Sequence, residues 1–299
     1  MFFKTDVQSK PFSGSTLIIP VVSIGNVPQL AADLIIATEK MQRVGTIDSC
    51  YVYSFSSEPA YEHCSNYPTA PIEVYQNIEG SYTIIQFRSP CLKNQKKFLA
   101  AQLIDFYKEH CFKDLVFLAS SNASFADDSV LSGSKIKAFD ICNAKNSELL
   151  KNLERCEIPI TKIYNKSDLS QLSCARDNSL DLDFNNISLS HNPNNYVDLD
   201  FSNKNLSHNP NYFADFINSG FIKHLIKISI DQNIPANAII MFANEGGKFT
   251  FNNIPEAITF ASLVNTLLNL LPPSNTTGWT KPLSWKWLHV DNIPQNMFY

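Results

Sequence analysis

Three short stretches of the sequence carry side chains whose types and spacing could do chemistry. The first, Ser23-Ile24-Gly25-Asn26, lies between an apolar run and a helical pattern, where backbone N–H groups can hold a phosphate. Neither the dinucleotide-binding glycine pattern nor the P-loop pattern is present. A tight turn at Gly25, with Asn26 as the N-cap of the helix, explains the same residues. We favour the turn and cap, and a phosphate site is the alternative.

The other two stretches resemble parts of hydrolase sites. Ser120, Ser121 and Ser124 follow an apolar run, where a nucleophilic serine could stand, but the Gly-x-Ser-x-Gly pattern is absent. Cys111 follows His110 directly, and helical neighbours point about 100° apart, so adjacency does not make a dyad. We expect Cys111 to be a core residue at a helix end. A small-molecule hydrolase or phosphorylase is the alternative function, and it needs a pocket with convergent ionisable groups near Gly25.

Composition and charge exclude several other classes of function. The 299 residues carry a net charge of −4, which gives no reason to expect nucleic acid or a membrane surface as a partner. The seven cysteines are widely spread without a Cys-x-x-Cys pair, as expected of reduced thiols. No apolar run approaches the roughly 20 residues that cross a bilayer. We expect a protein of the cytoplasm and nucleus that has no cofactor and no metal.

Apolar periodicity predicts alternating strands and helices that fold into an α/β domain. The helix that begins near Pro28 is expected to stop before Gly45. We predict a three-layer α/β/α domain with a mixed central sheet. The expected strands are 16–22, 72–76, 82–88, 115–119, 136–142 and 238–243, and the expected helices are 27–38, 93–111, 147–156, 220–230 and 255–271.

An Asn-rich segment interrupts this pattern. Asp181-Leu182-Asp183-Phe184 recurs as Asp198-Leu199-Asp200-Phe201, and two copies are too few for a repeat architecture. We interpret residues 165–213 as a disordered low-complexity insertion whose removal leaves the fold intact. Residues 1–164 and 214–271 then form one discontinuous domain, and residues 272–299 form a C-terminal tail with all three tryptophans. His191 and His208 in the insertion could bind a metal, which is the less favoured interpretation.

Five segments in the same order resemble the proteasome assembly chaperone 2 family. They are STLIIPVVSIGNVPQLAADLIIAT from Ser15, EVY from Glu73 with the strand ending at Ser89, LVFLASS from Leu115, NEGGKFTFNNIPEA from Asn244, and WTKPLSWKWL from Trp279. The fourth carries extra residues relative to the family pattern. The resemblance implies a chaperone, not an enzyme, that pairs with proteasome assembly chaperone 1. The pair would bind proteasome α subunits, promote formation of the α-ring and prevent its off-pathway association.

The resemblance also implies a docking peptide at the C-terminus, which in this group ends hydrophobic–tyrosine–any residue. Met297, Phe298 and Tyr299 occupy these positions, with Phe298 in place of the tyrosine. Two apolar side chains and a free carboxylate suit a groove that offers a lysine or backbone donors. The alternative is that these three residues pack on their own domain or fray.

Overall fold

The structure, a computed structural model, describes residues 1–4, 10–66, 68–125, 135–144, 147–163, 219–244, 253–271 and 278–287. Within these ranges the strands form one nine-stranded sheet. The strands are β1 (Phe2–Lys4), β2 (Thr16–Pro20), β3 (Gln42–Ile47), β4 (Ile72–Gln76), β5 (Tyr82–Phe87), β6 (Asp114–Asn122), β7 (Ile136–Ile141), β8 (Ile160–Ile163) and β9 (Ala236–Ala243). Their spatial order is β1-β3-β4-β5-β2-β6-β9-β7-β8.

The sheet is mixed, as the sequence predicts. Its centre is parallel: β2 lies between β5 and β6, and β6 pairs with β9 in the same sense. Antiparallel pairing flanks this centre, through β4 with β5 and β3 with β4 on one side and β7 with β9 on the other. The predicted hairpin of β4 and β5 is confirmed, with Gly80 in its turn.

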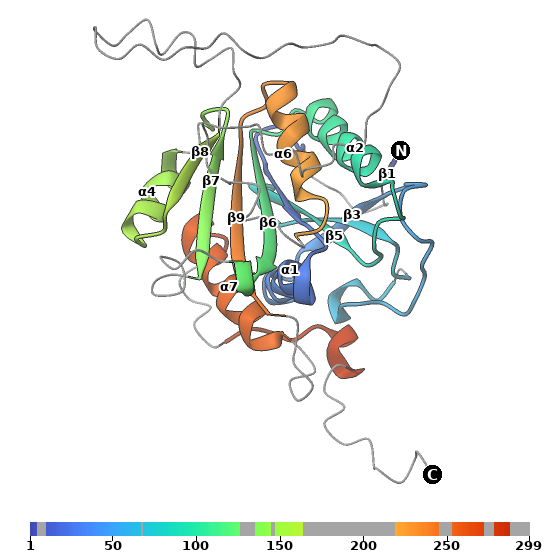
Figure 1. Ribbon diagram of the computed structural model, residues 1–299. Coiled ribbons are helices and arrows are strands. Elements are labelled where there is room, and N and C mark those ends of the chain that lie inside the picture. The colour runs from blue at the N-terminus through green and yellow to red at the C-terminus, as the bar shows by residue number, and fades with distance from the viewer. Residues whose placement is uncertain are drawn as a thin grey trace, which may run out of the picture.

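Helices cover both faces of the sheet. They are α1 (Val27–Glu39), α2 (Lys96–Glu109), α4 (Ser147–Arg155), α6 (Ile222–Asp231) and α7 (Ile254–Leu268). Figure 1 shows α2 and α6 together on one side, and α1 and α7 on the other. The predicted three-layer α/β/α architecture is therefore confirmed. Within the described residues, no helix is long and apolar enough to cross a membrane.

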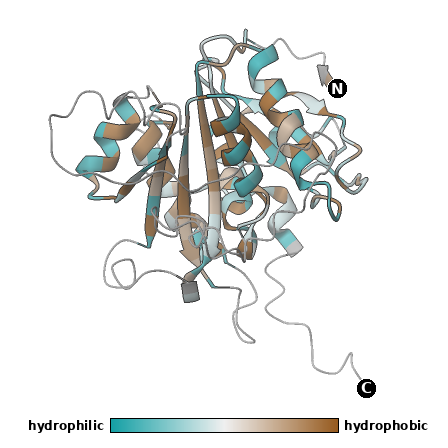
Figure 2. Cartoon of the chain, turned by 45° about the horizontal axis from the view of Figure 1, so that its top comes forward, coloured by the Kyte–Doolittle hydropathy of each residue, from teal (hydrophilic) through white to brown (hydrophobic). Residues whose placement is uncertain are grey.

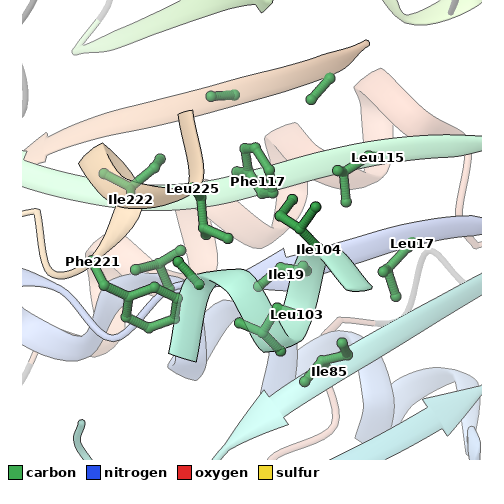
Figure 3. Close-up of a cluster of buried hydrophobic side chains, with 14 of the residues drawn as sticks. Leu17, Ile19, Ile85, Leu103, Ile104, Leu115, Phe117, Phe221, Ile222 and Leu225 are labelled. Atoms are coloured by element: carbon green, nitrogen blue, oxygen red, sulfur yellow. The ribbon is translucent and has the colours of Figure 1, made fainter. Parts of the chain in front are cut away.

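Two hydrophobic cores lie above and below the sheet because successive strand residues face opposite sides. On β2, Leu17 and Ile19 belong to the core under α2 and α6, whereas Ile18 belongs to the core under α1 and α7. Figure 3 shows Leu103 and Ile104 of α2 converging with side chains of α6 on the strands beneath. Figure 2 shows the corresponding pattern, with brown strands inside and teal on the outer helix surfaces.

The structure corrects two details of the sequence interpretation. Gly45 does not end the first helix, since α1 ends at Glu39 with Lys40 in the left-handed region, and Gly45 lies inside β3. Strands β1, β3 and β8 were not predicted. Two of them are edge strands of three and four residues, and β3 contains Arg43, Gly45 and Thr46, so none gives an apolar run.

Candidate functional site: the anchor of the C-terminal segment

The predicted docking residues Met297, Phe298 and Tyr299 lie outside the described residues, as do the insertion 165–213 and both of its histidines. The structure does describe the segment that leads to the tail, residues 278–287. This segment ends in a 3₁₀ turn, Leu283–Trp287, which is coloured red and lies below α1 in Figure 1. The geometry of this segment decides where a tail would start.

Four hydrogen bonds fasten residues 278–287 to the α1 side of the domain, and three of them come from Trp279, Thr280 and Ser284. The Trp279 indole N–H donates to Ser262 Oγ on α7 at 2.9 Å, and the Thr280 N–H donates to Thr38 Oγ1 on α1 at 3.0 Å. The Ser284 N–H donates to the carbonyl of Ala60 at 3.1 Å. The segment thus crosses both helices of this face before it reaches the turn.

Trp285 is the main anchor of the segment. Its side chain is only 2% exposed and belongs to the core under α1 and α7. Its indole N–H donates to Asp33 Oδ2 of α1 at 3.0 Å. A buried tryptophan supplies a large apolar area, and its polar N–H requires a partner, which the carboxylate provides.

Asp33 accepts hydrogen bonds from four side chains. Besides Trp285, its carboxylate accepts from the Tyr61 hydroxyl and from Gln86 Nε2, each at 2.6 Å. Arg88 binds both carboxylate oxygens, with Nη2 at 2.8 Å from Oδ1 and Nη1 at 3.1 Å from Oδ2. Such a two-pronged charged contact is among the strongest hydrogen-bonding arrangements in proteins. It fixes α1 against β5 and the turn at Trp285.

A second carboxylate extends the cluster across the sheet. Glu73 of β4 lies 3.4 Å from Arg88 Nε and 3.0 Å from Arg43 Nη1, and it accepts from the Tyr75 hydroxyl at 3.0 Å. All four charged side chains are nearly buried. Two carboxylates and two guanidinium groups alternate, so the buried charges balance. We call Asp33, Arg88, Glu73, Arg43, Tyr61 and Trp285 the anchor cluster.

The protonation states in the anchor cluster suit a structural role. Burial alone lowers the pKa of Arg88, but Asp33, Tyr61 and Glu73 outweigh it and raise that pKa above its ordinary value. Burial raises the pKa of Tyr61 well above the usual value, and although the charge of Arg88 opposes this rise, Asp33 adds to it. Arg88 therefore stays charged, and Tyr61 stays a neutral donor, throughout the physiological pH range.

The turn at Gly25 is filled by protein atoms. Gly25 has the left-handed φ of 64° that the predicted tight turn requires, and Asn26 is at the N-cap position without a side-chain capping bond. A Cβ placed on Gly25 would lie 1.7 Å from Asn253 Nδ2, so the Asn253 side chain covers the turn. The space over Gly25 that a phosphate would need is therefore occupied by the side-chain amide of Asn253.

The serines of β6 also serve the fold. Ser120 is buried, and its hydroxyl lies 2.9 Å from Ser23 Oγ and donates to the carbonyl of Ile24 at 2.6 Å. Ser120 and Ser23 thus tie the end of β6 to the turn before α1. Ser124 lies beyond the strand and is exposed.

His110 and Cys111 lie just past the end of α2. Their predicted separation is supported, since the His110 ring packs against Phe106, Phe2 and Phe12. The prediction that Cys111 is a core residue is wrong. Its backbone is left-handed, with φ 53°, and its side chain is exposed, because the helix ends at Glu109 and the chain turns away. Across the residues described, no cluster of three or more His, Cys, Asp or Glu could hold a metal.

Comparison with known proteins assigns the family. The PAC2 family model matches residues 17–169, which span β2 to β8 and include the carboxylates and guanidinium groups of the anchor cluster. The chain belongs to the PAC2 family. Proteasome assembly chaperone 2 of Danio rerio is 27% identical over 304 residues, covering 100% of each chain. The Xenopus laevis protein of that name is also 27% identical, over 96% of this chain and 95% of its own.

Solved structures support the same fold for this PAC2-family chain. PbaA of Pyrococcus furiosus, described as an archaeal homolog of proteasome-assembly chaperone, superposes with a TM-score of 0.54 at 13% identity, covering 88% of this chain and 85% of its own. PbaB of the same organism, described as an archaeal proteasome activator, gives a TM-score of 0.51 at 10% identity, covering 91% and 90%. At 13% and 10% identity, the similarity to these two structures supports a shared fold and nothing further.

The anchor cluster is the part of the site that the sequence analysis missed. Asp33 stands in the otherwise apolar helix LAADLIIA, and Glu73 stands in the strand IEVYQ. A charged residue on a buried face requires a partner of opposite charge. That rule predicts that Asp33 and Glu73 have partners of opposite charge. It does not predict which residues those partners are.

Proposed function

We propose that the chain is a chaperone for assembly of the core proteasome particle. The similarity to proteasome assembly chaperone 2 of Danio rerio, which covers 100% of both chains, carries this proposal. The aligned length includes the domain, the anchor of the C-terminal segment and the residues beyond it. The chain would act by binding other proteins and not by catalysis.

The proposed mode of action is that of a heterodimer. The chain pairs with a related subunit, proteasome assembly chaperone 1, in the cytoplasm and nucleus. The pair holds proteasome α subunits, promotes closure of the α-ring and prevents its association with other rings. The division into a domain of residues 1–164 and 214–271, an insertion of 165–213 and a tail of 272–299 belongs to the same proposal.

The tail residues Met297, Phe298 and Tyr299 are the proposed contact with the proteasome. Twelve residues, 288–299, follow the last described residue, Trp287. A fully extended chain of that length reaches at most about 40 Å. Because Trp285 is fixed in the core, the tail starts from a defined point. A fixed start restricts the volume that the tail explores, which raises its effective concentration at a groove within reach.

Co-expression with proteasome assembly chaperone 1 from the same source tests the pairing. We expect a one-to-one complex by size-exclusion chromatography with light scattering, and self-association or poor solubility of the chain alone. Partners that bury a large apolar interface behave in this way when they are separated. A stable, monodisperse monomer that does not bind the second chaperone would argue against pairing. Deleting Met297 to Tyr299 serves as the control, because it should leave this complex intact.

A further inference from the structure

Helix α7 has an outward face without charge. The helix packs between α1 and α4, on the side of the sheet that Figure 1 shows opposite α2 and α6. Asn152 Nδ2 of α4 donates to the carbonyl of Leu267 at 2.9 Å. From residue 257 to residue 280 the sequence contains no Asp, Glu, Lys or Arg, although 17% of the chain is charged. A helix at the surface of a globular protein usually carries charged side chains on the face that water reaches.

The other outer helices follow that rule. Exposed charged residues include Lys108 on α2, Lys151 on α4 and Lys227 on α6, and each of these helices also exposes an acidic residue. Helix α1 is buried along most of its length. Among the helices that the structure describes, α7 therefore combines an exposed face with the absence of charge. A face of this kind suits contact with another protein, because covering it removes no charge from water.

The exposed hydroxyl groups of α7 are used within the helix itself. Thr259 Oγ1 donates to the carbonyl of Pro255 at 3.0 Å, and Ser262 Oγ donates to the carbonyl of Ile258 at 2.8 Å. Thr266 Oγ1 donates in the same way to the carbonyl of Ser262 at 3.0 Å. Each hydroxyl hydrogen already has an acceptor four residues back. Another chain can therefore cover these side chains without leaving a donor unsatisfied.

The exposed positions of α7 form one straight stripe. They are Pro255, Thr259, Ser262, Thr266 and Asn269, which follow one another at intervals of four and three residues. This average spacing of 3.5 residues is the one at which a second helix can lie along the first over several turns. From the first to the last position the stripe is about 21 Å long, at 1.5 Å per residue. Its geometry fits a helix of another chain.

A tryptophan lies beside the stripe. Trp279 is partly buried against the core under α1 and α7, and its indole N–H donates to Ser262 Oγ at 2.9 Å. Ile258 and Leu263 of α7 are likewise only partly buried. Tryptophan is enriched among the residues that contribute most to binding between proteins. We call Ile258, Thr259, Ser262, Leu263, Thr266 and Trp279 the α7 face.

We propose that the α7 face is the surface by which this chain pairs with the related chaperone subunit, helix against equivalent helix. This inference rests on the proposed function and names the surface that the proposed heterodimer uses. Two chains of one fold that pair about an approximate two-fold axis place the same surface of each opposite the other. Charges of one sign at equivalent positions would then face each other and repel. The α7 face carries no such charge, whereas the outer faces of α2, α4 and α6 do.

The observations favour a protein helix over a lipid surface as the occupant of the α7 face. A helix that lies in a membrane interface combines large apolar side chains on one face with Lys and Arg on the other. The exposed stripe of α7 carries threonine and serine at its centre, and α7 contains no basic residue. The polar but uncharged stripe suits close packing of two helices better than insertion into lipid.

The dissociation constant of the co-expressed complex with proteasome assembly chaperone 1 tests this inference, measured by sedimentation velocity over a dilution series. Thr259→Lys together with Thr266→Lys should weaken pairing at least about tenfold, because two ammonium groups lose water at the contact and gain no partner. Thr259→Val together with Thr266→Val keeps the shape of both side chains. It should change the affinity by less than about twofold, since the hydroxyl groups bond within α7.

Gln42→Lys together with Ser124→Lys is the matched control, because it adds the same two charges at exposed positions outside the α7 face. It should change the affinity by less than about twofold. Equal affinity of the two lysine variants, or an equal loss in the valine and lysine variants on α7, would overturn this inference while the pairing itself stands. Circular dichroism verifies that each variant is folded.

Two further outcomes separate this inference from the proposed function. If the unaltered chain does not bind the related chaperone, the proposed heterodimer fails, and the α7 face loses its proposed partner with it. Binding of the chain alone to phosphatidylcholine vesicles, if it is lost in the lysine variant on α7, would overturn the inference in favour of a lipid surface.

Discussion

The anchor cluster brings two carboxylates, two guanidinium groups and their hydrogen-bonding partners together in one buried place. Asp33 accepts hydrogen bonds from Tyr61, Gln86, Arg88 and Trp285. The residues on either side of it in α1, from Leu30 to Ala37, are apolar. Buried ion pairs contribute less to stability than their Coulomb energy suggests, because both charges lose water. Removing one member is costly, since the other is then left buried and uncompensated.

Asp33→Asn should therefore destabilise the domain strongly. The amide offers one acceptor oxygen where the carboxylate offered two, and its NH₂ group faces other donors. We expect the free energy of unfolding to fall by about 3–5 kcal/mol, measured by urea denaturation. Asp105→Asn is the control: Asp105 forms an exposed pair with Lys108, and its loss should cost less than about 1 kcal/mol. Equal losses in the two variants would mean that the anchor cluster is not structural.

Sequence reasoning identified individual residues unevenly. The turn at Gly25 and the separation of His110 from Cys111 follow from local geometry, which a sequence displays. The partners of Asp33 do not, because Arg88 is 55 residues away and Trp285 is 252 residues away. The exposure of Cys111 depended on where α2 ends, and helix ends are less certain than helices themselves.

The elements were predicted best where their apolar patterns were long. Helices α1 and α7 begin at prolines as expected, and β6 and β9 are apolar throughout their centres. Strands β3 and β8 were not predicted because their sequences, QRVGTI and ITKI, mix polar with apolar residues. Neighbouring strands supply their hydrogen bonds, so they become strands through the sheet and not through their own propensity.

The entry into α6 depends on a single close backbone contact. Gly220 has φ 69°, and a Cβ there would lie 1.9 Å from the carbonyl oxygen of Val22. Gly220→Ala must therefore displace the main chain after β2 or move α6. We expect it to lower the thermal midpoint more than Gly14→Ala, because Gly14 also has positive φ but nothing within 4 Å of its Cβ position. Gly14→Ala then measures backbone strain alone, about 1–2 kcal/mol. Equal effects would show that the α6 junction tolerates displacement.

The lysines at the start of α2 and α6 surround His224, and they lead to a prediction about how the stability of the domain depends on pH. Burial lowers the pKa of His224 below 6.5, and four lysines, with Lys96 foremost, lower it further. The unfolded chain then binds this proton at a higher pH than the folded chain. The contribution of His224 to the free energy of unfolding is therefore fully present above pH 6.5, and it is lost as the pH falls below that value.

Lys96→Gln should raise the pKa of His224 toward 6.5, because one repulsive charge is removed. Titration of the imidazole C–H resonances by NMR measures this shift directly. Lys113→Gln is the matched control and should leave the resonance unchanged. An unaltered His224 titration in the Lys96 variant would show that Lys96 does not act on His224 between α2 and α6.

At the scale of the whole molecule, the fold separates two kinds of surface. One helical layer, with α2 and α6, carries the lysines that surround His224. The other helical layer, with α1 and α7, holds Trp285 and the start of the C-terminal tail.

Affinity purification from cells of the source organism tests the central claim most directly. The full-length chain is compared with a variant lacking Met297 to Tyr299, and mass spectrometry identifies what each recovers. The proposed function predicts that both recover proteasome assembly chaperone 1, and that the shortened chain recovers proteasome α subunits in much smaller amount. Recovery of neither partner by the full-length chain would contradict the assignment as a proteasome assembly chaperone.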